Sequence, residues 1–513
     1  MSRLLKLVCV GLFLASTVYA EPKPHKIRKH EAQGVPDEYI VVLQEGTRPE
    51  DVERIAHEIA DEYKVELKQL YAWSLQGFLV NGKPKKIEDL TADDRILYVE
   101  QNATGKADFE DPAESALVSS TQWTSWNNEY QWHLDRIDET SWANRDSQHN
   151  MCTEGRGAYA YVIDQGIWAG HSEFIEPVPS RVVRSLDFVG AANGAPDTTN
   201  GCGAPRQVLT SYHGTAVASV LAGTHIGAAK TQLVSLRVFG CDGSANIADF
   251  IEALDWIAGP NNPYRGSPGV INHSGFVPVT DALFTAYGDA VNRTVNSTNI
   301  PFFTSADNFS TDACRFSPNN RPYTRYNKTG RAFVVGGTSV GTSATDPNDY
   351  RWQTWETVDG QTLPRIGRDT GSNGGPCVSI YAPACDIYVA MYTGSTDYRR
   401  LSGTSFSSPL TAAVAARYME RQRNTTGVIP TATQVYEWLL GQSTRVVQNT
   451  TTAPTYWMCA RTTATGGFAI ANTLYRTYPG ANVCTTGYTL LEMPRATNTS
   501  DARHLYWDEG YCP

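Results

Sequence analysis

A serine at the start of a small-residue segment is the first group in this chain that could do chemistry. Residues 402–409 read SGTSFSSP and residues 410–417 read LTAAVAAR, which predicts a tight turn followed by a buried helix. Glycine permits such a turn, and proline is tolerated in a first helical turn because no N–H is needed there. We expect the turn to hold the Ser405 hydroxyl outside the helix, near the unpaired N–H groups at the positive end of the helix dipole. Ser405 is therefore a candidate nucleophile, although the motif alone fits a turn that caps a buried helix equally well.

Two other segments offer an acid and a base. The apolar run 158–164 predicts a strand that ends in Asp164, and His213 opens the segment 213–223 (HGTAVASVLAG), which predicts a helix with one buried face. A histidine at a helix start is, by itself, more often a cap or a surface residue than a base. Here a strand-end aspartate, a helix-start histidine and a helix-start serine occur together in that chain order. This combination indicates the acid, base and nucleophile of acyl transfer.

Alternating strands and helices are predicted to position these side chains. The expected strands are residues 158–164, 233–238, 269–271, 300–304 and 332–335, and the expected helices are residues 247–257 and 282–295. Alternation of this kind predicts an α/β domain with a mainly parallel sheet. Functional groups in such domains gather at the carboxyl ends of the strands, where Asp164 is expected to lie.

The chain resembles the subtilases, the subtilisin-like serine proteases, at these residues. Segments 402–409 and 213–223 fit the serine and histidine motifs of that family, in the family's order. Segments 132–137 (WHLDRI), 242–247 (DGSANI) and 317–318 (SP) resemble the proteinase K branch. The resemblance covers roughly residues 38–445. It implies a subtilisin-like α/β fold, a mainly parallel sheet flanked by helices, and serine endopeptidase activity on protein or peptide substrates.

The resemblance also implies a role for each matching residue. Ser405 would be the nucleophile, His213 the general base and then acid, and Asp164 the group that orients and stabilises the imidazolium. Asn308 would donate its side-chain N–H to the oxyanion beside the Ser405 N–H, although Asn308-Phe-Ser is also a glycosylation sequon. Substrate backbone is expected to pair near Gly243, Ser244 and Ala245 and near Ser274 and Gly275, and the specificity pocket is expected to be lined by Ser305, Ala306 and Asp307.

Several positions depart from the family pattern. Gln165 stands where the aspartate motif has serine or threonine, Asp307 stands where glycine usually precedes the oxyanion asparagine, and Ala216 replaces a frequent second histidine. These departures keep open an alternative function, a secreted binding protein built on a subtilase scaffold that has lost activity. Ser339 replaces the acidic residue of a calcium site in the proteinase K branch, so we expect no metal ion and no cofactor.

The carboxylate of Asp307 requires a partner, because an unpaired charge in a partly desolvated pocket is unfavourable. The partner is either a Lys or Arg side chain of the substrate or an internal cation such as Arg315, which is close in sequence. The first explanation predicts cleavage after basic residues, and the second predicts only a smaller pocket.

The first twenty residues predict export. A basic start, a short apolar run and small residues before position 20 are typical of a secretory signal peptide, residues 1–20, and the apolar run is too short for a membrane anchor. We therefore expect a secreted, extracellular and monomeric protein that does not bind membranes. The net charge of −10 argues against a nucleic-acid partner. Asn-X-Ser/Thr sequons support a glycosylating secretory route and occur at Asn102, Asn272, Asn292, Asn296, Asn327, Asn424, Asn449 and Asn498.

The remaining organisation is predicted from shifts in composition. Residues 21–37 are charged and predict a linker, residues 38–102 predict a small α+β domain, and residues 103–130 predict a cuttable linker before the large domain at 131–445. We interpret the small domain as an inhibitory propeptide, which the family resemblance also implies, and a permanent binding module is the alternative. Residues 446–513 form a cysteine-containing extension, either a flap on the large domain or a removable tail.

Nine of the ten cysteines remain after loss of the signal peptide. In an exported chain without clustered CxxC motifs these cysteines are expected to form disulfides rather than to bind metal. The family resemblance suggests the pairs Cys202–Cys241 and Cys314–Cys377. The other five leave an odd number and an open pairing: Cys152, Cys385, Cys459, Cys484 and Cys512.

Overall fold

The structure is a computed structural model of the 513-residue chain. It describes residues 27–30, 34–107, 118–119, 128–140, 144, 146, 149, 151–175, 180–190, 192–197, 212–278, 286–339, 349–352, 355–358, 361–364, 371–443, 447–448, 457–462, 468–475, 489–492, 503 and 505. The signal peptide predicted at 1–20 lies outside the described residues.

A mainly parallel sheet forms the centre of the large domain. Its strand order is β20-β16-β14-β12-β7-β10-β8-β9, and the pairs are parallel except β8 with β9. The central strands are rich in Val, Ile and Phe and are buried on both faces, as expected for strands covered by helices. The α/β prediction is confirmed. The strands are β7 (Tyr159–Asp164), β8 (Val182–Asp187), β9 (Ala195–Pro196), β10 (Gln232–Arg237), β12 (Gly269–His273), β14 (Phe302–Ser305), β16 (Ala332–Thr338) and β20 (Ile380–Pro383).

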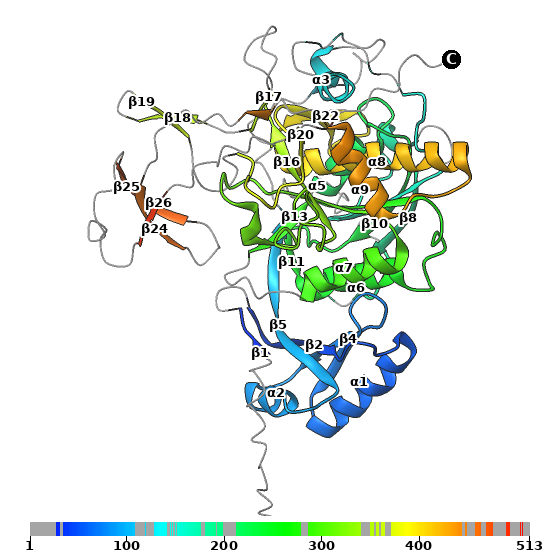
Figure 1. The fold of residues 1–513 in the computed structure, drawn as a ribbon, viewed down its shortest axis with the longest axis vertical. Helices are drawn as coiled ribbons and strands as arrows, with labels where there is room; N and C mark the ends of the chain where they lie inside the picture. The colour runs from blue at the N-terminus through cyan, green and yellow to red at the C-terminus, as the bar shows by residue number, and fades with distance from the viewer. Residues whose placement is uncertain are drawn as a thin grey trace, which may run out of the picture.

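Helices flank this sheet (Figure 1). Helix α8 packs along β12, β14, β16 and β20 and against α5, while α6 and α7 pack on each other on the side of the N-terminal unit. A capping box of Thr431 and Gln434 starts α9. The helices are α5 (His213–Ala222), α6 (Ile247–Ala258), α7 (Ala286–Thr298), α8 (Thr404–Thr426) and α9 (Ala432–Gln442).

The N-terminal unit folds around its own core. Strands β5, β2, β4 and β3 form an antiparallel sheet whose apolar side chains pack against the buried face of α1. The unit combines helices with a sheet, as the sequence predicted for residues 38–102. The elements are β2 (Gly34–Leu43), α1 (Pro49–Tyr63), β3 (Glu66–Tyr71), β4 (Gly77–Asn81), α2 (Pro84–Leu90) and β5 (Ile96–Ala107).

Two segments expected to be linkers contain strands instead. Within residues 21–37, β1 (Ile27–Arg28) pairs with β5, and β2 begins at residue 34. Within residues 103–130, β5 extends to residue 107 and pairs with β11 (Ser244–Asn246) and β13 (Gly275–Pro278) of the large domain. Charged sequence hid both strands, because strands that pair at a surface need few apolar residues.

The remaining described elements are short or peripheral, and β24 to β26 form a separate small sheet (Figure 1). Near the C-terminus, Arg503 and Leu505 pair with Tyr381 of β20 through backbone hydrogen bonds of 2.7 Å each, and the Leu505 side chain is buried. None of the helices in the described ranges is both long and apolar enough to span a bilayer. These elements are α3 (Asn128–Ile137), α4 (Ser172–Ile175), β6 (Val118–Ser119), η4 (Ala313–Arg315), β15 (Phe316–Ser317), β17 (Asp349–Tyr350), β18 (Trp355–Val358), β19 (Gln361–Pro364), β21 (Ile387–Ala390), β22 (Asp397–Leu401), β23 (Val447–Gln448), β24 (Trp457–Thr462), β25 (Phe468–Tyr475) and β26 (Thr489–Glu492).

Candidate active site

A buried aspartate and a buried histidine form a hydrogen-bonded pair at one end of the central sheet. Asp164 is the last residue of β7, and His213 is the first residue of α5. The His213 Nδ1 atom lies 2.9 Å from Asp164 Oδ1 and 3.0 Å from Asp164 Oδ2. With Nδ1 held by a carboxylate, the other ring nitrogen, Nε2, is left to exchange protons with a substrate or nucleophile. The two elements therefore place an acid–base pair where the sequence predicted it.

The candidate nucleophile lies in the first turn of α8. The helix begins at Thr404 rather than at residue 410, so the expectation that Ser405 lies outside the helix is wrong. The Ser405 hydroxyl is buried and makes no hydrogen bond to another described residue. Asp164, His213 and Ser405 have exposed fractions of 0, 1 and 2% in the full chain.

Pro409 explains how the serine turn is attached to the sheet. A proline inside a helix cannot donate to the carbonyl four residues earlier, which here is that of Ser405. Ser274, directly after β12, supplies the missing donor, because its hydroxyl donates to the Ser405 carbonyl at 3.0 Å. Since β12 is the neighbour of β7, this bond places the start of α8 over the strand next to Asp164.

Asn308 is held with its amide directed at the start of α8. Its Oδ1 accepts hydrogen bonds from the Thr404 backbone N–H at 2.9 Å and from the Thr404 hydroxyl at 2.8 Å. These two donors identify the oxygen end of the amide, so the Nδ2 end points the other way. A Cβ atom added to Gly403 would lie 3.3 Å from Asn308 Nδ2, which places this N–H donor beside the serine turn.

A strand from the N-terminal unit lies between the two segments predicted to bind substrate backbone. Residues 104–106 of β5 pair antiparallel with β11, and residues 106–107 pair antiparallel with β13. Of the predicted segments, Ser244, Ala245 and Gly275 take part in this pairing, Gly243 directly precedes β11, and Ser274 contacts Ser405 instead. The sequence did not identify Asn246 and Phe276, which also pair with β5. The arrangement can hold an extended peptide beside the acid–base pair.

The sequence model described as the Subtilase family (Peptidase_S8) matches residues 155–455, which is more than half of the chain. The chain belongs to the subtilase family.

Individual proteins of known name are similar to this chain. An alkaline serine exoprotease A of Vibrio alginolyticus is 31% identical over 396 residues, which cover 75% of this chain and 61% of that protein. An extracellular serine proteinase of Thermus sp. (strain Rt41A) is 30% identical over 353 residues, covering 69% of this chain and 68% of that protein. A crystal structure of a cold-adapted subtilisin-like serine proteinase is 28% identical, with a TM-score of 0.46, and covers 62% of this chain and 93% of that chain. The subtilase thus spans under two thirds of its Vibrio relative.

The predicted specificity residues of this subtilase lie together at the carboxyl end of β14. Ser305, Ala306 and Asp307 are fully buried, and Asp307 has a φ of 73°. A φ in this left-handed region favours glycine, which the family pattern usually has at this position. Asp307 Oδ2 accepts a hydrogen bond from Asn319 Nδ2 at 3.1 Å. The side chain of Arg315, the expected internal cation, is exposed.

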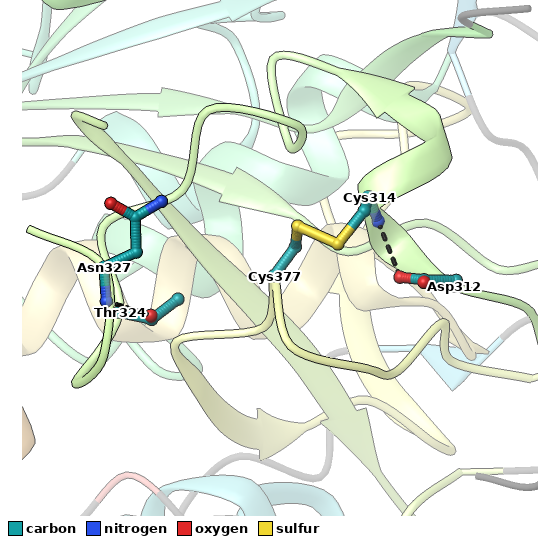
Figure 2. The surroundings of a disulfide bond; sticks show 5 residues. All are labelled: Asp312, Cys314, Thr324, Asn327 and Cys377. Atoms are coloured by element: carbon teal, nitrogen blue, oxygen red, sulfur yellow. Dashed lines mark hydrogen bonds between the residues drawn. A yellow bond between two sulfur atoms is a disulfide. The ribbon is translucent and has the colours of Figure 1, made fainter. Parts of the chain in front are cut away.

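A predicted disulfide fixes the loop that follows Asn308. Cys314 and Cys377 are bonded, with Cα atoms 5.3 Å apart, which confirms that pairing (Figure 2). Asp312 caps the same turn by accepting from the Cys314 N–H at 2.9 Å. Backbone hydrogen bonds between residues 310–313 and 371–374 join the same two segments. Cys241 is disulfide-bonded, but Cys202 lies outside the described residues, so the Cys202–Cys241 pairing stays a prediction.

A second histidine near the site is unsuited to act as the base. His273 ends β12 and is packed among the rings of Phe239, Phe250 and Tyr287. Burial, with a smaller contribution from His213, lowers the pKa of His273 to about 3. His273 is therefore neutral near pH 7.

Three of the predicted sequons have no room for a glycan in the folded chain. Asn102, Asn272 and Asn308 are at most 1% exposed, and each is hydrogen-bonded inside the protein. Asn424, by contrast, is exposed in the last turn of α8.

In the described ranges no group of three or more His, Cys, Asp and Glu is placed to hold a metal ion, and the expectation of no metal or cofactor stays a prediction.

Sequence reasoning missed the residues that support the candidate site. Thr404 orients Asn308, and Asn319 contacts Asp307 and the Ser305 carbonyl. Thr404 lies within the serine motif and could have been found there, because a hydroxyl and an N–H in one residue can hold one amide oxygen. Asn319 is twelve positions from Asp307, and no local pattern connects the two.

Proposed function

We propose that this subtilase is a secreted serine endopeptidase of the proteinase K-like branch that hydrolyses peptide bonds through Asp164, His213 and Ser405. The observation that carries the proposal is the buried Asp164–His213 hydrogen-bonded pair beside α8, the helix that carries Ser405 in its first turn. Proteins are the substrates of the family. The peptide binds as an extended strand between β11 and β13, where β5 lies in the full chain.

The catalytic steps follow from these positions. His213 Nε2 takes the proton of the Ser405 hydroxyl as Oγ forms a bond to the scissile carbonyl carbon, and the carbonyl electron pair moves onto its oxygen. Asp164 holds the imidazolium at Nδ1, while Asn308 Nδ2 and the Ser405 N–H stabilise the oxyanion. The carbon–nitrogen bond then breaks as His213 returns the proton to the leaving amine. A water molecule, with His213 again as the base, then attacks the carbonyl carbon of the acyl-enzyme. The bond from this carbon to Ser405 Oγ breaks, His213 returns the proton to Ser405, and the carboxylic acid product is released.

Covalent labelling tests this proposal directly. A fluorophosphonate reacts with an activated serine, so the mature protein should gain one adduct at Ser405, located by mass spectrometry of a proteolytic digest. Ser405→Ala should take up no label, and Asp164→Asn should label far more slowly because the imidazole loses its orientation. An unlabelled, folded wild-type protein would instead support the alternative, a subtilase scaffold that only binds other proteins.

The N-terminal unit is proposed to be an inhibitory propeptide that the enzyme removes itself. Its docking satisfies helix ends of the large domain: Glu100 accepts from the Ala286 N–H of α7 at 3.1 Å, and Asn102 accepts from the Ala248 N–H of α6 at 3.2 Å. Both contacts place oxygen atoms at the positive ends of helices. The extension of β5 into the groove keeps substrate out until the chain is cut and the unit leaves.

The strand register indicates where the cut occurs. Ala107 pairs with Gly275, and the preceding residue of that segment, Ser274, contacts Ser405. The antiparallel strand therefore runs toward the nucleophile, and the scissile bond follows residue 107 by one or a few positions. Sequencing of the mature N-terminus should find it in the first part of 108–122. A precursor carrying Ser405→Ala should remain uncut in a protease-deficient host, and normal processing of that variant would show that another protease makes the cut.

Mass spectrometry of the protein in the culture medium also tests whether it is secreted and in which processed form. We expect the mature enzyme to be extracellular and monomeric, to need no metal ion or other cofactor, and to be inhibited by its own propeptide when that is added back.

A further inference from the structure

We propose that Gln165 is a positioning residue that links the acid–base pair to the strand on which substrate binds. The inference rests on the proposed peptidase function and deepens it. Gln165 follows Asp164 directly and is fully buried. Its backbone N–H donates to Asp164 Oδ1 at 2.7 Å, its side-chain Oε1 accepts from the His213 N–H at 3.2 Å, and its Nε2 donates to the Gly240 carbonyl at 3.1 Å.

The first side-chain bond fixes the start of the histidine helix. The first N–H groups of a helix have no partner within the helix and need an outside acceptor. Tyr212 occupies the capping position of α5 and makes no side-chain cap. Gln165 Oε1 provides an acceptor in its place, so His213 is held at its backbone by residue 165 and at its ring by residue 164.

The second side-chain bond reaches the segment that carries β11. The Gly240 N–H donates to the Ser244 carbonyl at 2.7 Å, and the Gly243 N–H donates to the Gly240 carbonyl at 2.9 Å. Gly240 therefore forms the base of the turn that leads into β11, which pairs with residues 104–106. The Gln165 amide thus connects the base of the catalytic mechanism with the strand that aligns the peptide.

Only an amide of this length can make both contacts. A glutamine side chain carries an acceptor and a donor on one planar group. The serine or threonine of the family pattern has a single hydroxyl two bonds closer to the backbone and cannot reach both His213 and Gly240. The glutamine at position 165 therefore departs from the family pattern but still holds Asp164 and His213 in fixed positions.

The test compares Gln165→Met with wild type and with a matched control. Methionine keeps the length of the side chain and removes both hydrogen bonds. Gln131→Met is the control, because Gln131 is also buried and donates from its amide to a backbone carbonyl, that of His225, at 2.7 Å, on helix α3. Rates are measured per active site, counted by fluorophosphonate titration, with a peptide substrate that spans the groove.

The expected result has three parts. Gln165→Met lowers kcat/KM roughly 10–100-fold, because small displacements of reacting groups have effects of that size. KM rises at least threefold as β11 loses its support. Gln131→Met stays within about twofold of wild type, on the order expected for a change with a merely structural effect.

Two results would overturn the inference. One is a Gln165→Met enzyme whose kcat and KM are both within twofold of wild type. The other is a loss of activity that matches a loss of titratable sites, which shows an effect on folding alone. If Gln165→Met does not fold, Gln165→Asn gives the same test, because its amide is too short to span both partners. Failure of the wild-type protein to take up label would refute the proposed function itself and is separate from either result.

Discussion

The orientation of Asn308 is fixed by its neighbour Thr404. Its oxygen is occupied by two donors of Thr404, so its N–H group is directed at the serine turn before any substrate arrives. A donor held in this way needs no reorganisation when charge develops on the substrate oxygen, which is the condition for strong electrostatic catalysis.

Asn308→Ala is expected to lower kcat by about 10²–10³-fold with little change in KM, the size of effect known for the corresponding donor in subtilisin. Thr404→Val, which removes one of the two donors to Asn308, is expected to have a smaller effect in the same direction. Steady-state kinetics on a peptide substrate measure both. An Asn308→Ala enzyme that keeps more than a third of the wild-type kcat would show that the oxyanion is stabilised elsewhere.

We expect Asp307 to set the shape and charge of the specificity pocket. Asp307→Gly opens the pocket and relieves a backbone conformation that favours glycine, so cleavage is expected to shift toward Phe, Leu and Tyr before the scissile bond. If the carboxylate pairs with a substrate cation, the wild type prefers Lys or Arg and the variant loses that preference. Profiling both enzymes with a peptide library decides between the two explanations, and an unchanged profile would exclude Asp307 from the pocket.

Single residues differ in how well sequence predicts them. Asp164 and His213 lie in recognisable motifs, and the confirmed cysteine pair lies at positions covered by the family resemblance, so their contacts could be predicted. For Asp307, closeness in sequence suggested only Arg315 as an internal partner, and the structure adds Asn319, which donates to Asp307 from across a loop. Side-chain partners across loops depend on tertiary folding, and no periodic pattern encodes them.

At the scale of elements, α8 shows how one residue can mislead a boundary prediction. Pro409 usually marks a helix start, which placed the predicted helix at residue 410. The helix instead begins six residues earlier, because Ser274 satisfies the carbonyl that the proline leaves without a donor.

The sequence also left the C-terminal extension undecided, and the backbone pairing of Arg503 and Leu505 with Tyr381 attaches its end to β20.

The Cys314–Cys377 disulfide is expected to stabilise the large domain by about 4 kcal/mol, from the chain entropy of a loop with a sequence separation of 63. The double variant Cys314→Ser, Cys377→Ser should therefore unfold at lower urea concentration, measured in a Ser405→Ala background that prevents self-digestion. Cys385→Ser is the control and should change the midpoint far less. An unchanged midpoint in the double variant would mean that the backbone pairing of 310–313 with 371–374 suffices.

At the scale of the whole molecule, the surface between the N-terminal unit and α6 contains three carboxyl groups. Burial raises the pKa of Asp249 to about 7, of Glu252 to about 8 and of Asp255 to about 6. Glu38 and Asp187 add to the effect on Asp249, whereas the Trp73 and Ser74 N–H groups donate to Asp255 and oppose it. Burial in the docked chain therefore favours the protonated forms of these three carboxyl groups.

The sign of the resulting pH dependence follows from these raised values. An acid whose pKa is higher in the folded, docked state adds stability that is fully present below its ordinary pKa, near 4, and is lost as pH rises through about 6 to 8. The Ser405→Ala precursor is expected to melt several degrees lower at pH 8.5 than at pH 5.5. Glu252→Gln should reduce this difference, and Glu53→Gln, at an exposed position of α1, should not. Equal differences in both variants would exclude Glu252 from the effect.

The order of the units along the chain was predictable from composition, but their docking was not. In the sequence Glu100 is an ordinary polar residue and Asn102 is part of a sequon. Only the structure shows that Glu100 accepts a hydrogen bond from the start of α7 and Asn102 from the start of α6. Contacts between domains depend on the surfaces of both folded domains, and local sequence patterns do not reveal these surfaces.

Strand β5 is at once a central strand of the N-terminal sheet and the occupant of the groove. Once the bond after this strand is cut, the severed end remains tethered beside the groove by a folded anchor. A tethered segment competes with incoming peptides as if it were present at roughly millimolar concentration, whatever its amount in solution. If the enzyme processes itself as proposed, the delay between the cut and the onset of activity depends on how long the small sheet stays folded. Val41→Ala, which weakens the apolar core of that sheet, should therefore shorten the delay without changing any residue of the catalytic site.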